Sequence, residues 1–401
     1  MEMQRLVNHA IVAALDPGDG PSSFELPAAE CGTSPLGRLL FLGDVSLALG
    51  VAEFIEDRGT PAVFSKLPPD FFRADVVCFN LECCLTRRGV PIEYKPVYLV
   101  GEARYLDAFP CLEQCVAVLA NNHFLDRGVL GAVDTLTALE ERGVAYVGAR
   151  GPKARAQPCI KDTPGGRVAM LAFSSCSHAL RGTNAVNVEQ LDAEAAREAV
   201  QKATQQADQV CVLLHHGIEY FPFPHPRHRA LCRTLATAGA HLIVCHHPHV
   251  PQGVECLEGA IVAHSVGNFL FDVRLKPTER VAQTVALRVW LAGGRICRVQ
   301  FEPLVINDTL QPSPMDGVAR EEFLAHMRAL SVALHHPCHA RRWARKAVRA
   351  RLQEQIAGLR DNTRHLGLRG AFSYYSRRLS ELFSSHAYEA LRNKRTRNRN
   401  P

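Results

Sequence analysis

The short apolar runs of this chain share one property: several of them end directly before a residue type that binds metal ions. Because the carboxyl ends of neighbouring parallel strands meet at one edge of a sheet, we expect the residues after these runs to lie close together. The pattern predicts a ligand site at that edge. The runs and the residues that follow them are Arg38–Leu42 with Gly43-Asp44, Val76–Phe79 with Asn80-Leu81-Glu82, Val116–Leu119 with Asn121-Asn122-His123, Val210–Leu214 with His215, and Leu242–Cys245 with His247-Pro248-His249.

Helical segments alternate with these strand-like runs. Apolar spacing predicts helices over Val129–Arg142, Val188–Ala207 and Arg227–Ala238. Alternation of strands and helices is typical of layered α/β folds. Further strands are predicted over Val144–Val147, Val168–Phe173 and Ile261–His264, and a hairpin over Gln283–Leu291 and Ile296–Leu304 around Gly293-Gly294.

The pattern divides the chain into three parts. Residues 1–37 form a weakly patterned N-terminal leader, residues 38–306 form the α/β domain, and residues 307–401 form a basic helical extension in which the strands stop. The extension differs in net charge from the rest of the chain. Residues 341–401 hold 16 Lys and Arg against 4 Asp and Glu, a net charge of +12, and the remainder of the chain carries −6. Such a segment favours an anionic partner, for example nucleic acid, a membrane surface, a polyanion or an acidic protein.

Composition excludes several classes of protein. An apolar share of 47% and a charged share of 21% are typical of a globular protein. No apolar stretch reaches the roughly 18 residues of a transmembrane helix, and the N-terminus, with Glu2 near its start, does not resemble a signal peptide. The 14 cysteines include no CxxC pair, which favours reduced thiols and a cytoplasmic location.

The residues after the apolar runs form a mixed donor set. His247 and His249 offer two imidazoles two positions apart, which can bind two metals, or one metal from two sides. Two carboxylates, one amide oxygen and several imidazoles suit Mn, Fe or Zn better than Ca or Mg. A carboxylate shared by two cations is the arrangement of two-metal hydrolases, so we expect one or two divalent transition metals. The candidate donors are Asp44, Glu82, Asn122, His215, His247 and His249.

Several simpler interpretations remain open. Asp44 could be a turn residue after Gly43, and Asn122-His123 could cap the helix that starts near Val129. Strand neighbours point to opposite faces, so His215 is preferred over His216 as a ligand. His241 and His264 are interpreted as structural, His246 is not expected to be a ligand because of the same alternation, and the group His335-His336-Pro337-Cys338-His339 lacks paired ligand spacing. Ala263-His264-Ser265-Val266-Gly267 imitates a nucleophile elbow, but no helix opens at its serine, which argues against a serine hydrolase.

Taken in order, these motifs resemble the CapA family, which is named for poly-γ-glutamate capsule synthesis and is related to calcineurin-like metallophosphoesterases. The resemblance covers residues 38–272 and implies a four-layer α/β sandwich of two sheets flanked by helices, with a helical C-terminal extension. The motifs are Phe41-Leu42-Gly43-Asp44-Val45, Asn80-Leu81-Glu82, Ala120–Gly128, His215-His216-Gly217-Ile218-Glu219-Tyr220, His247-Pro248-His249-Val250 and Ser265-Val266-Gly267-Asn268-Phe269.

The resemblance also implies roles for individual residues. Asp44 and His249 would bind a first metal, Glu82 would bridge, and a second metal would take Asn122, His215 and His247. His123 would protonate a leaving group or hold a phosphoryl oxygen, oriented by Asp126. Substrate contacts are implied for Lys95, Glu219 and Asn268.

Two positions depart from the wider metallophosphoesterase pattern. Ser46 stands where that pattern has a histidine, and Glu82 replaces the usual bridging aspartate. We therefore expect a metal-dependent hydrolase that acts on an anionic substrate, either a phosphate ester or a carboxylate-bearing peptide or polymer. The alternative is a non-catalytic, metal-stabilised protein that binds an anionic polymer.

Overall fold

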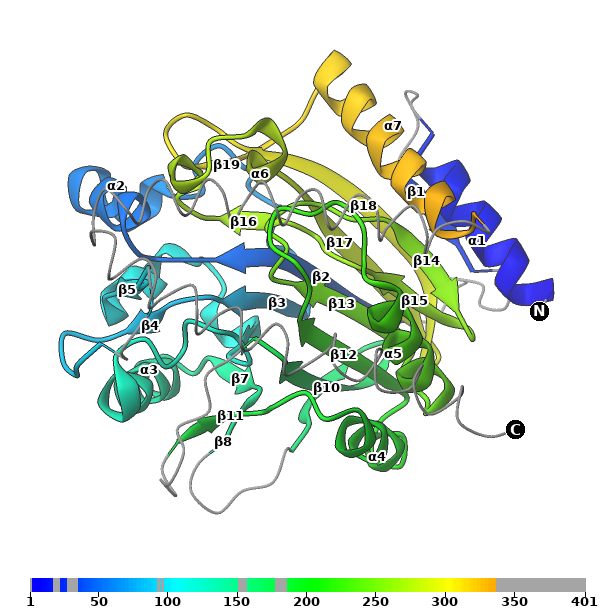
Figure 1. Cartoon of the computed structure of the whole chain (residues 1–401), viewed down its shortest axis with the longest axis horizontal. Helices are drawn as coiled ribbons and strands as arrows, with labels where there is room; N and C mark the ends of the chain where they lie inside the picture. The colour runs from blue at the N-terminus through cyan, green and yellow to red at the C-terminus, as the bar shows by residue number, and fades with distance from the viewer. Residues whose placement is uncertain are drawn as a thin grey trace, which may run out of the picture. The chain divides into compact units, whose positions relative to one another are not determined.

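The computed structural model describes residues 2–16, 22–26, 35–91, 95, 97–150, 157–176 and 186–336. The chain divides into two units, Met1–Ala340 and Arg341–Pro401. The second unit, with the predicted basic segment, lies outside the described residues, as do Pro337, Cys338 and His339 of the histidine-rich group. The first unit is a four-layer α/β sandwich, as predicted: two sheets pack face to face and helices cover their outer faces (Figure 1).

The first sheet contains the strands that carry the carboxylates. Its central strands β2, β3, β6 and β7 are parallel, so their carboxyl ends lie at the same edge. In spatial order the strands are β1 (Ser23–Glu25), β18 (Arg295–Ile306), β17 (Gln283–Ala292), β2 (Leu36–Val45), β3 (Val76–Leu81), β6 (Cys115–Val118) and β7 (Ala145–Val147), while β16 (Asn268–Leu270) pairs with β2 and β19 (Pro312–Pro314) with β18.

The second sheet carries the imidazoles. Its strands β10, β12, β13 and β15 are parallel, and two antiparallel strands close its edges. In spatial order the strands are β14 (Val254–Leu257), β15 (Ala260–Ala263), β13 (Leu242–His246), β12 (Gln209–His215), β10 (Gly166–Ser174) and β9 (Cys159–Thr163). Two small sheets pair β4 (Cys84–Leu85) with β5 (Val100–Gly101) and β8 (Ala149–Arg150) with β11 (Asn187–Val188).

Apolar burial holds the layers together. Between the sheets, β2 lies against β13 and β9, and its run Leu39–Leu42 is fully buried. On the outer face of the second sheet, α4 (Ala193–Ala203) and α5 (Pro226–Thr237) form their own apolar cluster with β10, β12 and β13. The remaining helical elements of this unit's body are α2 (Gly50–Arg58), α3 (Gly128–Glu141), α6 (Glu279–Ala282) and the 3₁₀ turns Thr60–Ala62, Ala103–Ala108, Leu112–Gln114 and Val273–Leu275.

Helix α1 (Glu2–Ala14) lies in the segment where the sequence analysis found only weak patterning. It packs on both β1 and β14, which are edge strands of the two sheets, and α7 (Gly317–Leu334) lies beside it (Figure 1). The polar Asn8 that interrupts its apolar run pairs with the backbone of the edge strand: Cys256 N donates to Asn8 Oδ1 at 2.7 Å, and Asn8 Nδ2 donates to Cys256 O at 3.1 Å. Asn8 therefore joins α1 to the edge strand β14.

Three expectations were wrong in detail. The predicted helix Val188–Ala207 is shorter, because Val188 belongs to β11 and Asp192 caps α4 by accepting from the backbone N–H groups of Glu194 and Ala195. Strands continue past residue 306 in β19. Cys297 is disulfide-bonded, so the cysteines are not all reduced thiols. Among the described residues, no helix has the length and apolar content needed to cross a membrane.

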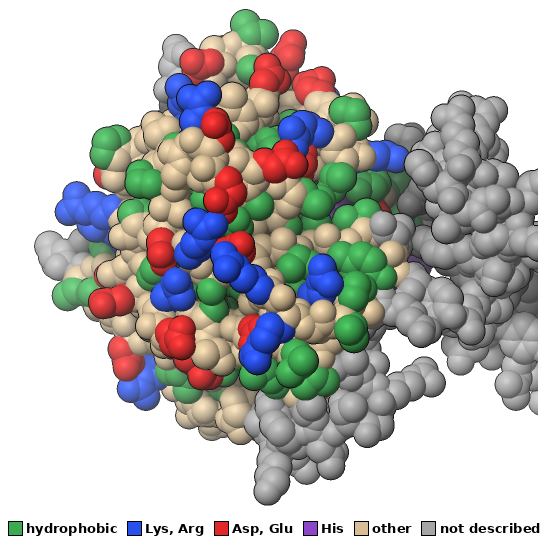
Figure 2. Space-filling model, turned by 90° about the vertical axis from the view of Figure 1, so that its left-hand side faces the viewer, with side chains coloured by type: hydrophobic (Ala, Val, Ile, Leu, Met, Phe, Trp, Pro, Cys, Tyr) green, Lys and Arg blue, Asp and Glu red, His purple; other side chains and the backbone are tan. Residues whose placement is uncertain are grey.

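Charged side chains of both signs are interspersed on the described surface. Figure 2, which views the molecule from the left-hand side of Figure 1, shows Lys and Arg alternating with Asp and Glu over that face. Many of these charges are paired, as in the ion pairs Arg88–Asp134 and Arg104–Glu56. This face therefore offers no single-sign patch within the described residues, and the charge asymmetry of the sequence rests on residues 341–401.

We predict that Gly43→Ala destabilises the protein. A Cβ at this position would collide with the carbonyl of Gly267 on the segment leading into β16, to which Asp44 N donates at 3.0 Å. Forcing these segments apart in a packed interior should lower the free energy of unfolding by about 1–3 kcal/mol. Urea denaturation followed by circular dichroism measures the change. An unchanged midpoint would show that the two segments can separate freely.

Candidate metal centre

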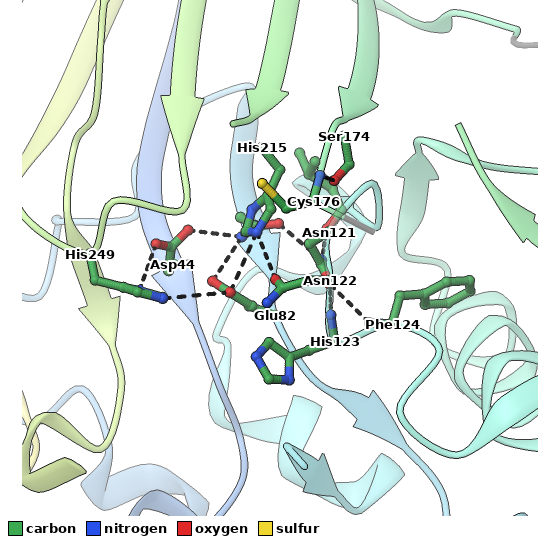
Figure 3. Close-up of polar contacts among 12 residues, drawn as sticks. Asp44, Glu82, Asn121, Asn122, His123, Phe124, Ser174, Cys176, His215 and His249 are labelled. Atoms are coloured by element: carbon green, nitrogen blue, oxygen red, sulfur yellow. Dashed lines mark hydrogen bonds and ion pairs between the residues drawn. The ribbon is translucent and has the colours of Figure 1, made fainter. Parts of the chain in front are cut away.

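Two groups of buried side chains that could bind a metal lie where the carboxyl ends of the parallel strands of both sheets meet. One group contains Glu82, His215 and His247, and the other contains Asp44, Glu82 and His249. Within each group the potential ligand atoms lie within 4.8 Å of one another. Glu82 belongs to both groups, and Figure 3 shows Asp44, Glu82, His215 and His249 turned toward a common space. The structure thus brings together residues from positions 44 to 249.

The distances place Glu82 in the middle. Its Oε1 lies 3.6 Å from His215 Nε2 and 3.8 Å from His249 Nε2. On one side, His249 Nδ1 lies 3.3 Å from Asp44 Oδ2. On the other side, His215 Nε2 lies 2.8 Å from Asn122 Oδ1, and the rings of His215 and His247 are 4.7 Å apart. One carboxylate therefore faces both groups of donors.

The donor atoms at the centre lack hydrogen bonds. Asp44 Oδ2, Glu82 Oε1 and His247 Nδ1 are all buried without a hydrogen-bond partner. Buried polar atoms are normally satisfied, and a buried carboxylate without compensation is costly. Oxygen and imidazole donors of this kind suit Mn, Fe or Zn. The residues present therefore fit one or two divalent transition metals.

The electrostatics of the centre also favour a cation. Burial and the neighbouring Asp44 raise the pKa of Glu82 well above its ordinary value. Burial lowers the pKa of His249, but the carboxylates of Glu82 and Asp44 outweigh it and raise that pKa to about 10. Burial and the surrounding imidazoles lower the pKa of His215 well below its ordinary value. The raised pKa values of Glu82 and His249 mean that the carboxylates favour added positive charge, which protons supply here and a bound cation would supply in their place.

Two asparagines that the sequence analysis left without a role hold the carboxylates in place. Asn80 Nδ2 donates to Asp44 Oδ1 at 2.8 Å and to Glu82 Oε2 at 3.2 Å, and lies 3.3 Å from His215 Nδ1. Asn121 Nδ2 donates to Asn80 Oδ1 at 3.1 Å, while Asn121 Oδ1 accepts from the backbone N–H of His123 at 3.0 Å. These contacts fix the orientation of the donors, as supporting hydrogen bonds do around metals.

Strained backbone positions the imidazoles after β13. His247 and His249 have φ angles of 95° and 56°, and Tyr220, which faces them, has a φ of 60°. Left-handed conformations are unfavourable for such side chains and persist at functional sites where packing enforces them. Here Tyr220 N donates to Pro248 O at 2.7 Å, and the Tyr220 ring stacks on His249 at 5.8 Å.

His123 lies beside the centre, and its side-chain contacts with Asp126 and Lys95 are both made at one ring nitrogen, Nδ1. Its Nδ1 is 2.7 Å from Asp126 Oδ2 and 2.9 Å from Lys95 Nζ. Burial lowers the pKa of His123 to about 4, and although Asp126 opposes this shift, the charge of Lys95 adds to it. The contacts at Nδ1 leave Nε2 as the ring atom available to a ligand.

Two residues implied to contact substrate are engaged with protein atoms. The Lys95 ammonium group donates to Asn122 O at 2.6 Å and to the Asp126 carboxylate, besides its contact with His123. Asn268 lies beside His249: Asn268 Oδ1 is 2.8 Å from His249 Nδ1, and Asn268 Nδ2 donates to Val281 O at 3.1 Å. Both residues are therefore placed to orient His123 and His249.

Glu219 and Cys176 also lie at the centre. Burial raises the pKa of Glu82 and works to lower the pKa values of His247 and His249, and the negative charge of Glu219 adds a smaller effect that raises all three. Cys176, which the sequence analysis missed, interacts with His247. The sequence pattern that marked the other site residues also applies to Cys176, because Cys176 follows the apolar strand β10 at its carboxyl end.

The other histidines that the sequence analysis considered lie outside the metal centre. His216 contacts Ser175 and stacks on His228, with ring centroids 4.9 Å apart. His246 Nε2 lies 3.1 Å from Leu42 O, and His241 Nδ1 accepts from Val210 N at 3.1 Å. His264 lies 2.8 Å from Glu255. None of these histidines belongs to the two groups at Glu82.

Solved structures similar to this chain include several phosphoester hydrolases. They include a novel phosphatase from Mycoplasma pneumoniae, with 12% identity, a TM-score of 0.41, and 68% of this chain and 95% of that chain covered. The calcineurin-like phosphoesterase YfkN from Bacillus subtilis gives 14% identity and a TM-score of 0.38, with 74% and 97% covered.

Sequence relatives cover much of the chain. The PGA biosynthesis protein CapA of Bacillus subtilis (strain 168) is 31% identical over 280 residues, which cover 69% of this chain and 73% of that protein. The capsule biosynthesis protein CapA of Bacillus anthracis is 30% identical over 244 residues, 58% of this chain and 59% of that protein. A probable polyglutamine synthesis accessory protein of Mycobacterium tuberculosis (strain ATCC 25618 / H37Rv) is 27% identical over 212 residues, 49% of this chain and 56% of that protein.

A family model confirms the resemblance drawn from the motifs. The model described as bacterial capsule synthesis protein PGA_cap matches residues 38–273. This segment contains every strand end that contributes a donor to the metal centre, from Asp44 to His249. The chain therefore belongs to the bacterial capsule synthesis protein PGA_cap family.

Proposed function

We propose that the protein is a metal-dependent hydrolase that acts on an anionic substrate. The observation that carries this proposal is the pair of buried, unbonded carboxylate oxygens of Asp44 and Glu82 facing His215 and His249. Asp44 and His249 would hold one cation, Asn122, His215 and His247 a second, and Glu82 would bridge them. A bound divalent cation supplies Lewis-acid chemistry and makes hydroxide available near neutral pH.

The residues beside the cations would orient the substrate and move a proton. Because His123 Nδ1 faces Asp126 and Lys95, proton exchange with a ligand would take place at Nε2. An anionic substrate next to the ring favours the imidazolium form. His123 would then protonate the leaving group from Nε2 as a general acid, while Lys95 and Asp126 fix its ring.

The charge of the centre and the names of the relatives support the proposed substrate class. A cation site with a proton donor suits a phosphate ester or a carboxylate-bearing peptide or polymer. The relatives named for capsule and PGA biosynthesis favour a poly-γ-glutamate chain as the polymer to test first. The basic residues 341–401 would add affinity for such a polyanion.

A second candidate function is binding without catalysis. Ser46 is buried beside Asp44, its Oγ has no hydrogen-bond partner, and it replaces an imidazole of the wider metallophosphoesterase pattern. A first cation would therefore have fewer donors and bind more weakly. One relative is named as an accessory protein. In this case the metal would stabilise a surface that binds the anionic polymer.

We predict that Glu82→Gln removes both metal and turnover. The variant keeps the shape of the side chain but loses the charge shared by the two donor groups, so metal affinity should fall by at least about 100-fold. Elemental analysis and hydrolysis of a phosphodiester and of poly-γ-glutamate provide the measurements. Glu102→Gln, which alters an exposed ion pair with Arg87, is the matched control. Wild-type protein that holds metal but hydrolyses neither substrate would favour the binding function.

We predict that His123→Ala spares metal binding and lowers turnover by about 10²–10⁴-fold, because a positioned general acid contributes that much. Metal content and kcat are measured on the same preparation. His326→Ala on α7 changes a partly exposed histidine outside the centre and should behave as wild type. Unchanged turnover in His123→Ala would exclude the proposed proton transfer.

We predict that Asn80→Ala weakens metal binding by about 10–100-fold, the usual effect of losing a hydrogen bond that orients a metal ligand. Competition with a chromophoric chelator measures the affinity. The fold should survive, since the substitution removes a few polar atoms and leaves β3 intact. Wild-type affinity would mean that Asp44 and Glu82 keep their orientation without the Asn80 amide.

A further inference from the structure

A second cluster of metal-binding side chains lies between α5 and the second sheet. His228 and Cys232 are four residues apart on α5, so they share one face of the helix. Cys245 lies on β13, and these three residues form a compact buried group. His264, which follows β15, lies next to Cys232. All four side chains are at most 2% exposed.

The separations within this cluster match a tetrahedral metal site. His228 Nε2 lies 3.6 Å from Cys232 Sγ and 3.5 Å from Cys245 Sγ. Zinc bonds of about 2.0 Å to nitrogen and 2.3 Å to sulfur, meeting at a tetrahedral angle, place the two ligand atoms about 3.5 Å apart. Both observed separations therefore equal an edge of such a tetrahedron.

His264 lies next to Cys232 but outside the group whose ligand atoms are all within 4.8 Å of one another. Its Nε2 lies 2.8 Å from Glu255 Oε1, and Arg229 donates to both oxygens of the same carboxylate, at 2.6 and 2.5 Å. When Nε2–H donates to Glu255, Nδ1 carries the lone pair. That Nδ1 is buried and has no hydrogen-bond partner. A carboxylate that orients a histidine in this way is the common support of zinc ligands.

We propose that His228, Cys232 and Cys245 bind Zn²⁺ at a structural site, with His264 beside them as the candidate for a fourth ligand. Two thiolates with imidazole nitrogens are the ligands of structural zinc sites, and the thiolates distinguish this cluster from the oxygen and nitrogen donors of the centre at Glu82. Binding releases the thiol protons to solvent and places the cation among apolar neighbours that include Leu235, Ile243 and Val262.

The position of this site explains what it would do. The cation would join α5 to β13 and to the segment after β15. Cys245 precedes His247 by two residues, and His216, which follows His215, stacks on His228. The site would therefore fix the strand ends from which the imidazoles of the metal centre project.

Metal analysis of the full-length protein tests the proposal. In Glu82→Gln, which is depleted at the first centre, one equivalent of zinc per chain should remain. Adding Cys232→Ser or Cys245→Ser to Glu82→Gln should remove it. Cys211→Ser is the matched control, because it changes a buried cysteine on β12 that belongs to no ligand group among the described residues. A metal-free Glu82→Gln protein, or zinc retained in both cysteine variants, would overturn the proposal.

Cobalt spectroscopy gives a readout that does not depend on how well the cysteine variants fold. Co²⁺ added to zinc-depleted Glu82→Gln should produce the intense visible bands of a tetrahedral ion and near-ultraviolet sulfur-to-metal charge transfer. Weak bands without charge transfer would contradict thiolate ligation. Mass analysis after denaturation and alkylation checks the main competing arrangement: a Cys232–Cys245 disulfide in the isolated protein would also overturn the proposal.

Discussion

The structure depends on the burial of two carboxylates, Asp44 and Glu82, at the junction of two sheets. Removing an ionised carboxylate from water costs several kcal/mol even after relaxation, unless charges or hydrogen bonds compensate it. Asn80 supplies hydrogen bonds to one oxygen of each carboxylate, and His249 lies against the other oxygen of Asp44. Glu82 Oε1 keeps no hydrogen bond. The compensation is therefore incomplete without a cation, and the surrounding fold is arranged to receive one.

Strand geometry explains how this junction forms. The first sheet delivers the carboxylates and the asparagines, and the second delivers the imidazoles, because the parallel strands of both sheets end at the same place. β16 pairs with β2 so that Asn268 lies opposite Asp44, and this register brings the Asn268 amide to His249. Only glycine at position 43 allows the segment before β16 to approach this closely. The pairing of the strands thus places the backbone of the site residues close enough for their side chains to meet.

The sequence predicted the parts of this arrangement that depend on local pattern. Apolar runs located β2, β3, β6, β12 and β13, and alternation along β12 separated His215, which faces the centre, from His216, which stacks on α5. The sequence did not assign a role to Asn80, because its partners Asp44 and His215 lie 36 and 135 residues away. Nothing in the neighbouring residues of an asparagine at a strand end indicates such contacts. Nor could the sequence show that Lys95 and Asn268 are engaged with protein atoms, since this follows only from their neighbours in space.

The metal centre at Glu82 and the cluster of His228, Cys232 and Cys245 differ in their ligand types and in their surroundings. Oxygen donors and imidazoles gather at the carboxyl ends of the strands, whereas the thiols of Cys232 and Cys245 lie in the apolar layer beneath α5. A thiol is the least costly metal ligand to bury without a metal, because it behaves as a small hydrophobic side chain. β13 carries a member of one set at Cys245 and ends at the first member of the other, His247. Any shift of this strand would therefore disturb both sets, so the second set restrains the geometry of the first through a single rigid element.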